Sequence, residues 1–156
     1  MARSAARAAA MQLVYENLMG GSGEDTLDAL IAFVPEGDDQ EYIDATTAGI
    51  EDHAKELDEL ISRYSTSREL ARIARVDLCI LRLALYEMKY SHSVGESVAI
   101  NEAVELAKRF SEPASVRFIN GMLGAISRGE EPEQKPTQSA SVQSKNAQAD
   151  GEKQNS

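Results

Sequence analysis

The sequence of 156 residues predicts an all-α fold of about seven helices. Three observations support this class. Apolar residues recur at steps of three and four through most of the chain, which is the spacing of one helix face. Serine, glycine and proline fall between these runs, at positions typical of helix ends. No alternating strand pattern occurs before residue 129, and Asn120-Gly121 lies inside a helical pattern rather than between two strands.

The first half of the chain contains three predicted helices. Residues 3–19 are rich in alanine, and two glycines end the run. A short helix is expected after Ser22 and before Pro35. A long helix is expected to open at Gly37 and Asp38, with a single apolar stripe at Ile43, Thr47, Ile50, Ala54, Leu57, Ile61 and Tyr64.

The second half contains the remaining helices. Residues 66–69 form a capping box for a fourth element, and residues 93–96 form another before a later helix. Between them, residues 76–90 are apolar on nearly all sides, which predicts a central buried helix. Pro113 suits the first turn of a last helix, whose expected core positions are Val116, Ile119, Met122, Leu123 and Ile126.

The domain organisation follows from a change in composition. We assign residues 1–128 to one helical domain. Residues 129–156 contain only four apolar side chains and are rich in glutamine, serine, proline and charge. Because such a segment cannot bury enough surface to offset its ordering entropy, we predict a disordered polar tail.

Charge is distributed unevenly along the chain. The net charge is −10, with +1 in residues 1–19, −12 in residues 20–62, +3 in residues 63–128 and −2 in the tail. An acidic protein does not attract nucleic acid by its overall field. An anion-binding surface would therefore combine the start of the chain with its later half. The acidic segment would face solvent or a basic protein.

Other features exclude several classes. No stretch is long and apolar enough to span a membrane, and the N-terminus lacks the apolar block of a signal peptide. Cys79 is the single cysteine, so no internal disulfide can form and a cytoplasmic location is expected. We expect Cys79 to pack as a small hydrophobic residue.

No motif for catalysis or cofactor binding is present, so we predict a protein that is not an enzyme and needs no cofactor. The two histidines, His53 and His92, are far apart and lack ligand spacing. A metal site built from them and nearby acids is a weak alternative, and we predict no metal ligand.

The last predicted helix carries a candidate surface for single-stranded RNA. Arg117, Gly121 and Gly124 fall opposite its core stripe, with Phe118 and Asn120 at the flanks. Each glycine costs a helix about 1 kcal/mol relative to alanine, which is understandable if another helix or a nucleic-acid backbone approaches closely. The aromatic, cationic and amide groups could stack, bind phosphate and read a base edge. Periodicity alone favours the alternative that Phe118 is a peripheral core residue.

The first predicted helix carries Arg3 and Arg7, one turn apart and in line with Val14 and Leu18. We expect its later turns to pack while its first turns overhang the body with both cations exposed. Two arginines are a weak electrostatic footprint, so the protein is expected to bind RNA poorly alone.

Four strings give the chain a family likeness. ARSAARAAAMQLVYE, VDLCILRLALYEMKY, VAINEAVELAKRF and VRFINGMLG, in this order and spacing, resemble the NusB family of bacterial transcription antitermination factors. The likeness runs from about Arg3 to Arg128 and is most specific between Val76 and Leu123.

The resemblance implies an all-helical domain of two packed subdomains. It also implies binding of the boxA element of nascent ribosomal-RNA leaders, jointly with the ribosomal protein NusE, in an antitermination complex with RNA polymerase. The implied RNA contacts are Arg3, Arg7, Gln12, Tyr15, Arg117, Phe118 and Asn120. Asp77 matches a position that faces NusE, and alternatively it complements the dipole of its own helix.

One departure from the family and two alternatives stay open. The family's first helix carries a tighter arginine cluster, whereas Ser4, Ala5 and Ala8 dilute it here, which makes a basic partner more necessary. One alternative is a homodimeric helical interaction module that binds no RNA. The other is a detached RNA-binding domain of a ribosomal-RNA methyltransferase.

Overall fold

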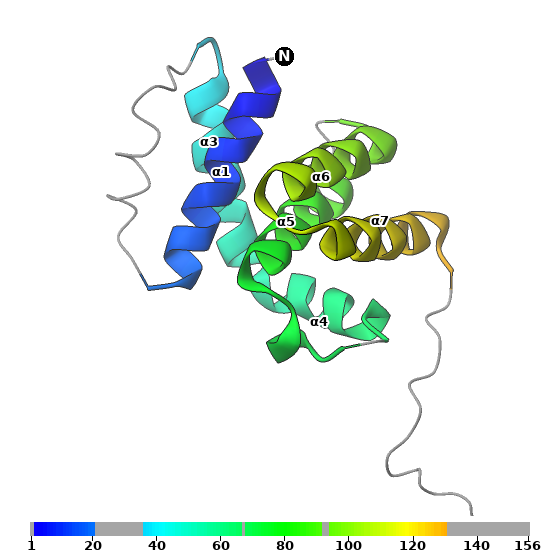
Figure 1. Cartoon of the computed structure of the whole chain (residues 1–156). Helices are drawn as coiled ribbons and strands as arrows, with labels where there is room; N and C mark the ends of the chain where they lie inside the picture. The colour runs from blue at the N-terminus through cyan, green and yellow to red at the C-terminus, as the bar shows by residue number, and fades with distance from the viewer. Residues whose placement is uncertain (1, 21–35, 67, 92–93, 131–156) are drawn as a thin grey trace, which may run out of the picture.

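The computed structural model describes residues 2–20, 36–66, 68–91 and 94–130. These ranges contain a 3-10 turn, η1 (Leu70–Arg72), a π-helical turn, η2 (Glu87–Ser91), and six α-helices: α1 (Ala2–Leu18), α3 (Asp39–Asp52), α4 (Ala54–Tyr64), α5 (Arg75–Tyr86), α6 (Glu96–Phe110) and α7 (Pro113–Arg128) (Figure 1). The predicted all-α class is confirmed. The helix predicted between Ser22 and Pro35 lies outside the described residues, as does the predicted tail beyond residue 130.

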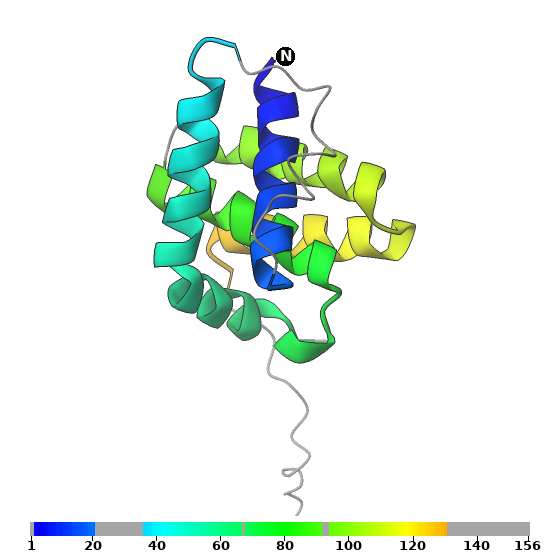
Figure 2. The same cartoon turned by 90° about the vertical axis from the view of Figure 1, so that its left-hand side faces the viewer.

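Helix α5 is the centre of the fold, as its apolar sequence predicts. It packs against α1, α3, α4, α6 and α7. Leu81, Leu83 and Leu85 are at most 1% exposed, because neighbouring helices cover them from several sides. Figures 1 and 2 show α1 and α3 side by side on one side of α5, and α6 with α7 on the other. This arrangement corresponds to the two packed subdomains that the resemblance implies.

Small residues let α1 and α3 approach closely. Ala6, Ala9 and Ala10 of α1 form a separate buried cluster with Tyr42 and Ile43 of α3. This cluster explains the alanine-rich sequence of the first helix, because larger side chains would push the two axes apart.

A glycine has the same effect farther along α3. A Cβ atom at Gly49 would overlap the phenol ring of Tyr86, so any larger residue there would force that ring to move. The contact brings the later half of α3 close to α5.

The prediction of one long third helix is wrong in one respect. The helix divides at His53 into α3 and α4. The backbone of His53 leaves the helical conformation at φ −107° and ψ 15°, and its ring stacks on Tyr90 with ring centroids 3.8 Å apart. The break involves one residue, so Ile50 before it and Leu57 after it both remain buried. The apolar stripe therefore predicts the core face correctly although the helix is interrupted.

Both predicted capping boxes need correction. The fourth element is only the single turn η1, and no side chain caps its start. Helix α6 begins at Glu96 with Gly95 at its N-cap, so the box that starts at Ser93 is out of register with the helix. Short Ser-x-x-Glu patterns are common, and their spacing alone does not establish where a helix starts.

Helix α7 follows its prediction closely. Pro113 occupies its first turn, the predicted core positions are buried or half-buried, and Gly129 ends it in the left-handed conformation at φ +70°. The Tyr64 hydroxyl donates a hydrogen bond of 2.8 Å to the carbonyl of Glu130, which joins the end of α4 to the end of α7. No helix within the described ranges has the length and apolar character needed to cross a membrane.

Candidate RNA-binding surface

The first half of α7 presents an open surface with one exposed cation. Arg117 and Gly121 are exposed, as the helical wheel predicts, and Asn120, predicted at the flank, is exposed as well. Gly124, also predicted to be exposed, is half-buried beside the side chain of Arg128. Apart from the adjoining residues and backbone of its own helix, no atom of the described residues lies within 4 Å of the position that a Cβ at Gly121 would occupy. No described helix of this chain therefore accounts for that glycine, and the smooth patch is open to an external ligand.

The structure places Phe118 at the edge of the core. Its ring is half-buried and packs against the main apolar cluster. The guanidinium carbon of Arg68 lies 4.4 Å from the ring centroid, within the range of a cation–π contact. Phe118 is thus a peripheral core residue, the alternative that periodicity favoured. Sequence reasoning missed Arg68, because it lies fifty positions before Phe118, inside a predicted capping box that gives its side chain no role.

The expectation that Arg7 is exposed is wrong. Its side chain is 3% exposed and forms two hydrogen bonds with the Glu87 carboxylate, Nε to Oε1 at 2.8 Å and Nη2 to Oε2 at 3.0 Å. The Tyr42 hydroxyl donates to the same carboxylate at 2.9 Å. A third contact of 3.4 Å joins Arg7 Nη1 to Glu102. Arg7 therefore joins α1 to η2, α3 and α6 inside the molecule.

Electrostatics keep Arg7 charged in this interior site. Burial acts to lower the pKa of Arg7, but the hydrogen bond to Glu87 and the surrounding negative groups outweigh it, so the pKa stays above its ordinary value. One signal in the sequence could have found the pair. Glu87 is a carboxylate within a run predicted to be covered on most sides, and pairing with a buried cation is one of the ways in which such a group is stabilised.

The other candidates on α1 have different surroundings. Gln12 and Tyr15 are half-buried, and Tyr15 packs against the main core. Arg3 lies in the first turn of α1, and its side chain is outside the described residues. The nearby Ser4 hydroxyl donates to Glu102 of α6 at 3.0 Å, so this turn lies against α6 rather than overhanging the body.

Asp77 is placed inside the chain. It is fully buried, and both carboxylate oxygens accept hydrogen bonds of 2.5 Å, one from the Ser111 hydroxyl and one from the Ser115 hydroxyl. Because these serines flank the start of α7, Asp77 holds the α6–α7 junction against the first turn of α5. Asp77 has no exposed surface for a partner in this structure, which corrects the expectation that it faces one.

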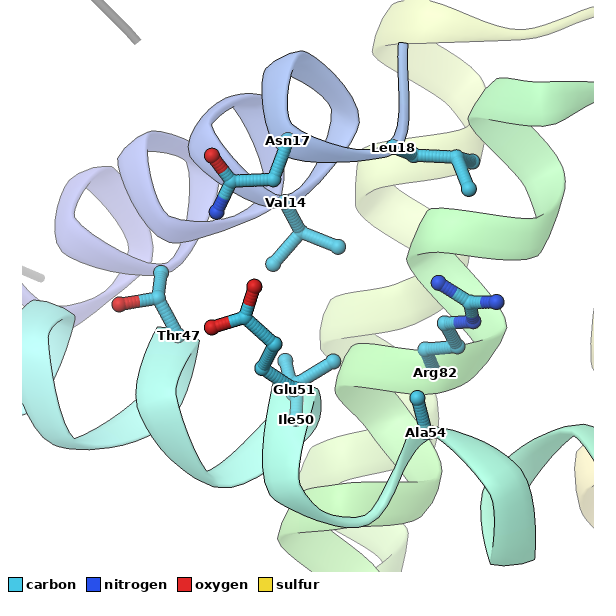
Figure 3. Close-up of a pocket in the computed structure, with 8 residues that line it drawn as sticks. All are labelled: Val14, Asn17, Leu18, Thr47, Ile50, Glu51, Ala54 and Arg82. Atoms are coloured by element: carbon cyan, nitrogen blue, oxygen red, sulfur yellow. The ribbon is translucent and has the colours of Figure 1, made fainter. Parts of the chain in front are cut away.

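A pocket of about 240 Å³ lies where α1, α3 and α5 meet (Figure 3). Val14, Leu18 and Ile50 form its apolar side, and polar groups lie at its edge: Asn17, Thr47, Glu51 and Arg82. Arg82 is already held by Asp58 through two hydrogen bonds of 2.7 and 2.8 Å. Glu51 adds negative charge to this pocket and Arg82 is already paired with Asp58, which makes the pocket unfavourable for phosphate.

The described residues contain no cluster of three or more potential metal ligands. His53 is engaged in its stack with Tyr90, and His92 is outside the described residues. Cys79 is fully buried in α5, and burial raises the pKa of its thiol to about 12.

These features define an all-helical binding protein whose open cationic patch suits a nucleic-acid strand. Comparisons with known proteins identify the family. The NusB family model matches residues 4–128. The transcription antitermination protein NusB of Acetivibrio thermocellus is 41% identical over 128 residues, which cover 81% of this chain and 88% of that protein. The chain therefore belongs to the NusB family.

Solved structures agree with this membership. NusB of T. maritima aligns with a TM-score of 0.69 and 30% identity, covering 83% of this chain and 93% of that one. The same fold occurs in a crystal structure of the antitermination factors NusB and NusE in complex with double-stranded RNA. That match has a TM-score of 0.71 and 23% identity, and it covers 82% of this chain and 97% of the other.

Proposed function

We propose that this protein is a transcription antitermination factor that binds the boxA element of nascent ribosomal-RNA leaders together with the ribosomal protein NusE. The observation that carries the proposal is the patch at the start of α7. There an exposed arginine, Arg117, and an exposed amide, Asn120, flank the open backbone of Gly121. Phosphate, a base edge and close backbone approach are all available to a single strand at this place.

The charge distribution supports joint rather than independent binding. The net charge is −10, and burial removes Arg7 from the set of cations that could reach phosphate. A basic ribosomal protein would offset the acidic field and add phosphate contacts. A family member has been crystallised with NusE and RNA, which supports this choice of partner.

The role is one of binding rather than catalysis, and the wider partner is the antitermination complex on RNA polymerase. Such a protein would act where transcripts are made, in the bacterial cytoplasm. Self-association into a homodimer is the competing state. A homodimer that covers Arg117 would prevent RNA binding, so it is tested by the same experiment.

Fluorescence anisotropy tests the proposal directly. A labelled boxA-like RNA and a scrambled control are titrated with the full chain, with and without NusE, at two salt concentrations. We expect tight, sequence-dependent and salt-sensitive binding only in the presence of NusE. Equal binding of both RNAs, or no binding at concentrations where the protein is folded and monomeric, would contradict the proposal.

A further inference from the structure

The most basic short stretch of the chain is the connection between α4 and α5 together with the helix ends on either side of it. Residues 63–75 contain four arginines, at positions 63, 68, 72 and 75, and a single acid, Glu69. Arg63, Arg72 and Arg75 are exposed, and Arg68 is half-buried. No ion pair is found at any of these four arginines among the contacts of the described residues. On an acidic protein, a concentration of cations that form no ion pair within the described part of the chain is an anion-binding feature.

The fold brings this connection beside the patch on α7. Arg68 reaches the ring of Phe118 at 4.4 Å, next in sequence to Arg117. Figure 2 shows η1 and the start of α5 on the same side of the molecule as the start of α7. The two cationic segments are thus neighbours in space although some fifty residues separate them along the chain.

The backbone that carries Arg68 is held in place. The buried hydroxyl of Ser65 donates a hydrogen bond of 2.5 Å to the Arg68 carbonyl. The ring of Phe118 then supports the guanidinium from the other side. A cation fixed at both its backbone and its head group loses little entropy when it binds a ligand, which is what a preorganised contact requires.

We propose that Arg68 contacts the phosphate backbone of the bound RNA and extends the surface of Arg117 and Asn120 across the α4–α5 connection. This inference rests on the proposed function. RNA is the occupant that the charge favours, because the connection supplies positive charge where the rest of the acidic chain would repel a polyanion. Phe118 then acts through Arg68, by positioning its guanidinium, rather than by stacking on a base itself.

The test uses the full chain with NusE and a labelled boxA-like RNA. Three variants are compared with the parent across a range of salt: Arg68→Ala, Arg68→Lys and the matched control Lys55→Ala, which removes an exposed cation from α4. For Arg68→Ala we expect about fivefold weaker binding near 0.1 M salt and a salt slope lower by about 0.7, the effect of one lost phosphate contact. Arg68→Lys restores both quantities, and Lys55→Ala changes neither.

Each other outcome overturns the inference and identifies what failed. If the parent binds RNA while Arg68→Ala matches Lys55→Ala, Arg68 is not a contact although the proposed function stands. Weaker binding at an unchanged salt slope, without rescue by lysine, would mean that Arg68 acts only by packing on Phe118. Weaker binding to NusE without RNA would make the patch a protein interface. If the parent itself binds no RNA with NusE, the proposed function fails as well.

Discussion

The guanidinium of Arg7 and the carboxylate of Glu87 form a buried bidentate ion pair between residues eighty positions apart, with N–O distances of 2.8 and 3.0 Å. Tyr42 and Glu102 complete the network, so one arginine holds together α1, α3, η2 and α6. The pair fixes α1 against the helices that follow it. The first helix is therefore anchored by charge as well as by its alanine face.

Replacing Arg7 is expected to lower the free energy of unfolding substantially. Arg7→Met leaves the Glu87 carboxylate buried without a cation, and we expect a loss of about 3–5 kcal/mol in the free energy of unfolding. Urea denaturation followed by circular dichroism measures it. The double variant Arg7→Met/Glu87→Leu should lose less than the single variant, because no buried charge remains unpaired. A single variant as stable as the parent would show that Arg7 is solvent-accessible.

Asp77 is expected to stabilise the fold rather than to contact NusE. Asp77→Ala leaves the hydroxyls of Ser111 and Ser115 without their acceptor, so we expect a loss of about 1–3 kcal/mol in unfolding free energy. The same urea titration measures this loss. The double variant Ser111→Ala/Ser115→Ala should be destabilised too, because it leaves the buried Asp77 carboxylate without its two hydrogen-bond donors. A fully stable Asp77→Asn variant with weakened NusE binding would instead favour a partner contact.

Arg117 should matter for RNA and not for stability, since its side chain is exposed. With NusE present, Arg117→Ala should weaken boxA binding and reduce the slope of log affinity against log salt by about 0.7. The unfolding free energy should change by no more than about 0.5 kcal/mol. Lys55→Ala serves as the charge-matched control. A large drop in stability for Arg117→Ala would contradict its placement on the outer face of α7.

Because the thiol of Cys79 is buried, we expect the protein to lose stability at high pH. The folded protein raises the pKa of the buried thiol from 9.0 to about 12, so between these values the unfolded chain ionises its thiol while the folded chain does not. The unfolding free energy attributable to this group is therefore complete below pH 9 and falls as the pH rises toward 12. Urea titrations from pH 8 upward should show a steeper fall for the parent than for Cys79→Ala. Parallel curves would indicate an accessible thiol.

The helices were predictable because their signals are local. The stripe of α7 at Ile119, Met122 and Leu123, its proline start and the apolar sequence of α5 all depend on residues within a few turns of each other. The same locality explains why the sequence places Arg117 and Gly121 correctly on the outer face of α7. Helical periodicity determines which side of a helix a residue occupies.

The surroundings of charged residues were not predictable in this way. Arg7 and Asp77 look like exposed charges from their own helices, and only the folded chain brings Glu87 to the first and two serines to the second. The long helix divides at His53, whose ring stacks on Tyr90, nearly forty residues away in the sequence. Apart from the charged Glu87 within an apolar run, no local pattern in the sequence indicates these contacts.

The sequence by itself therefore determined the all-helical class, the central helix, the family and the open face of α7, because each depends on local periodicity or on strings of consecutive residues. Only the tertiary structure decided which charges are buried and paired and which remain open to a ligand. The reason is that the cost of burying a charge is met by groups distant in sequence. In the folded chain, Arg7 lies in the interior rather than on the candidate RNA surface, and Arg68 lies beside Phe118.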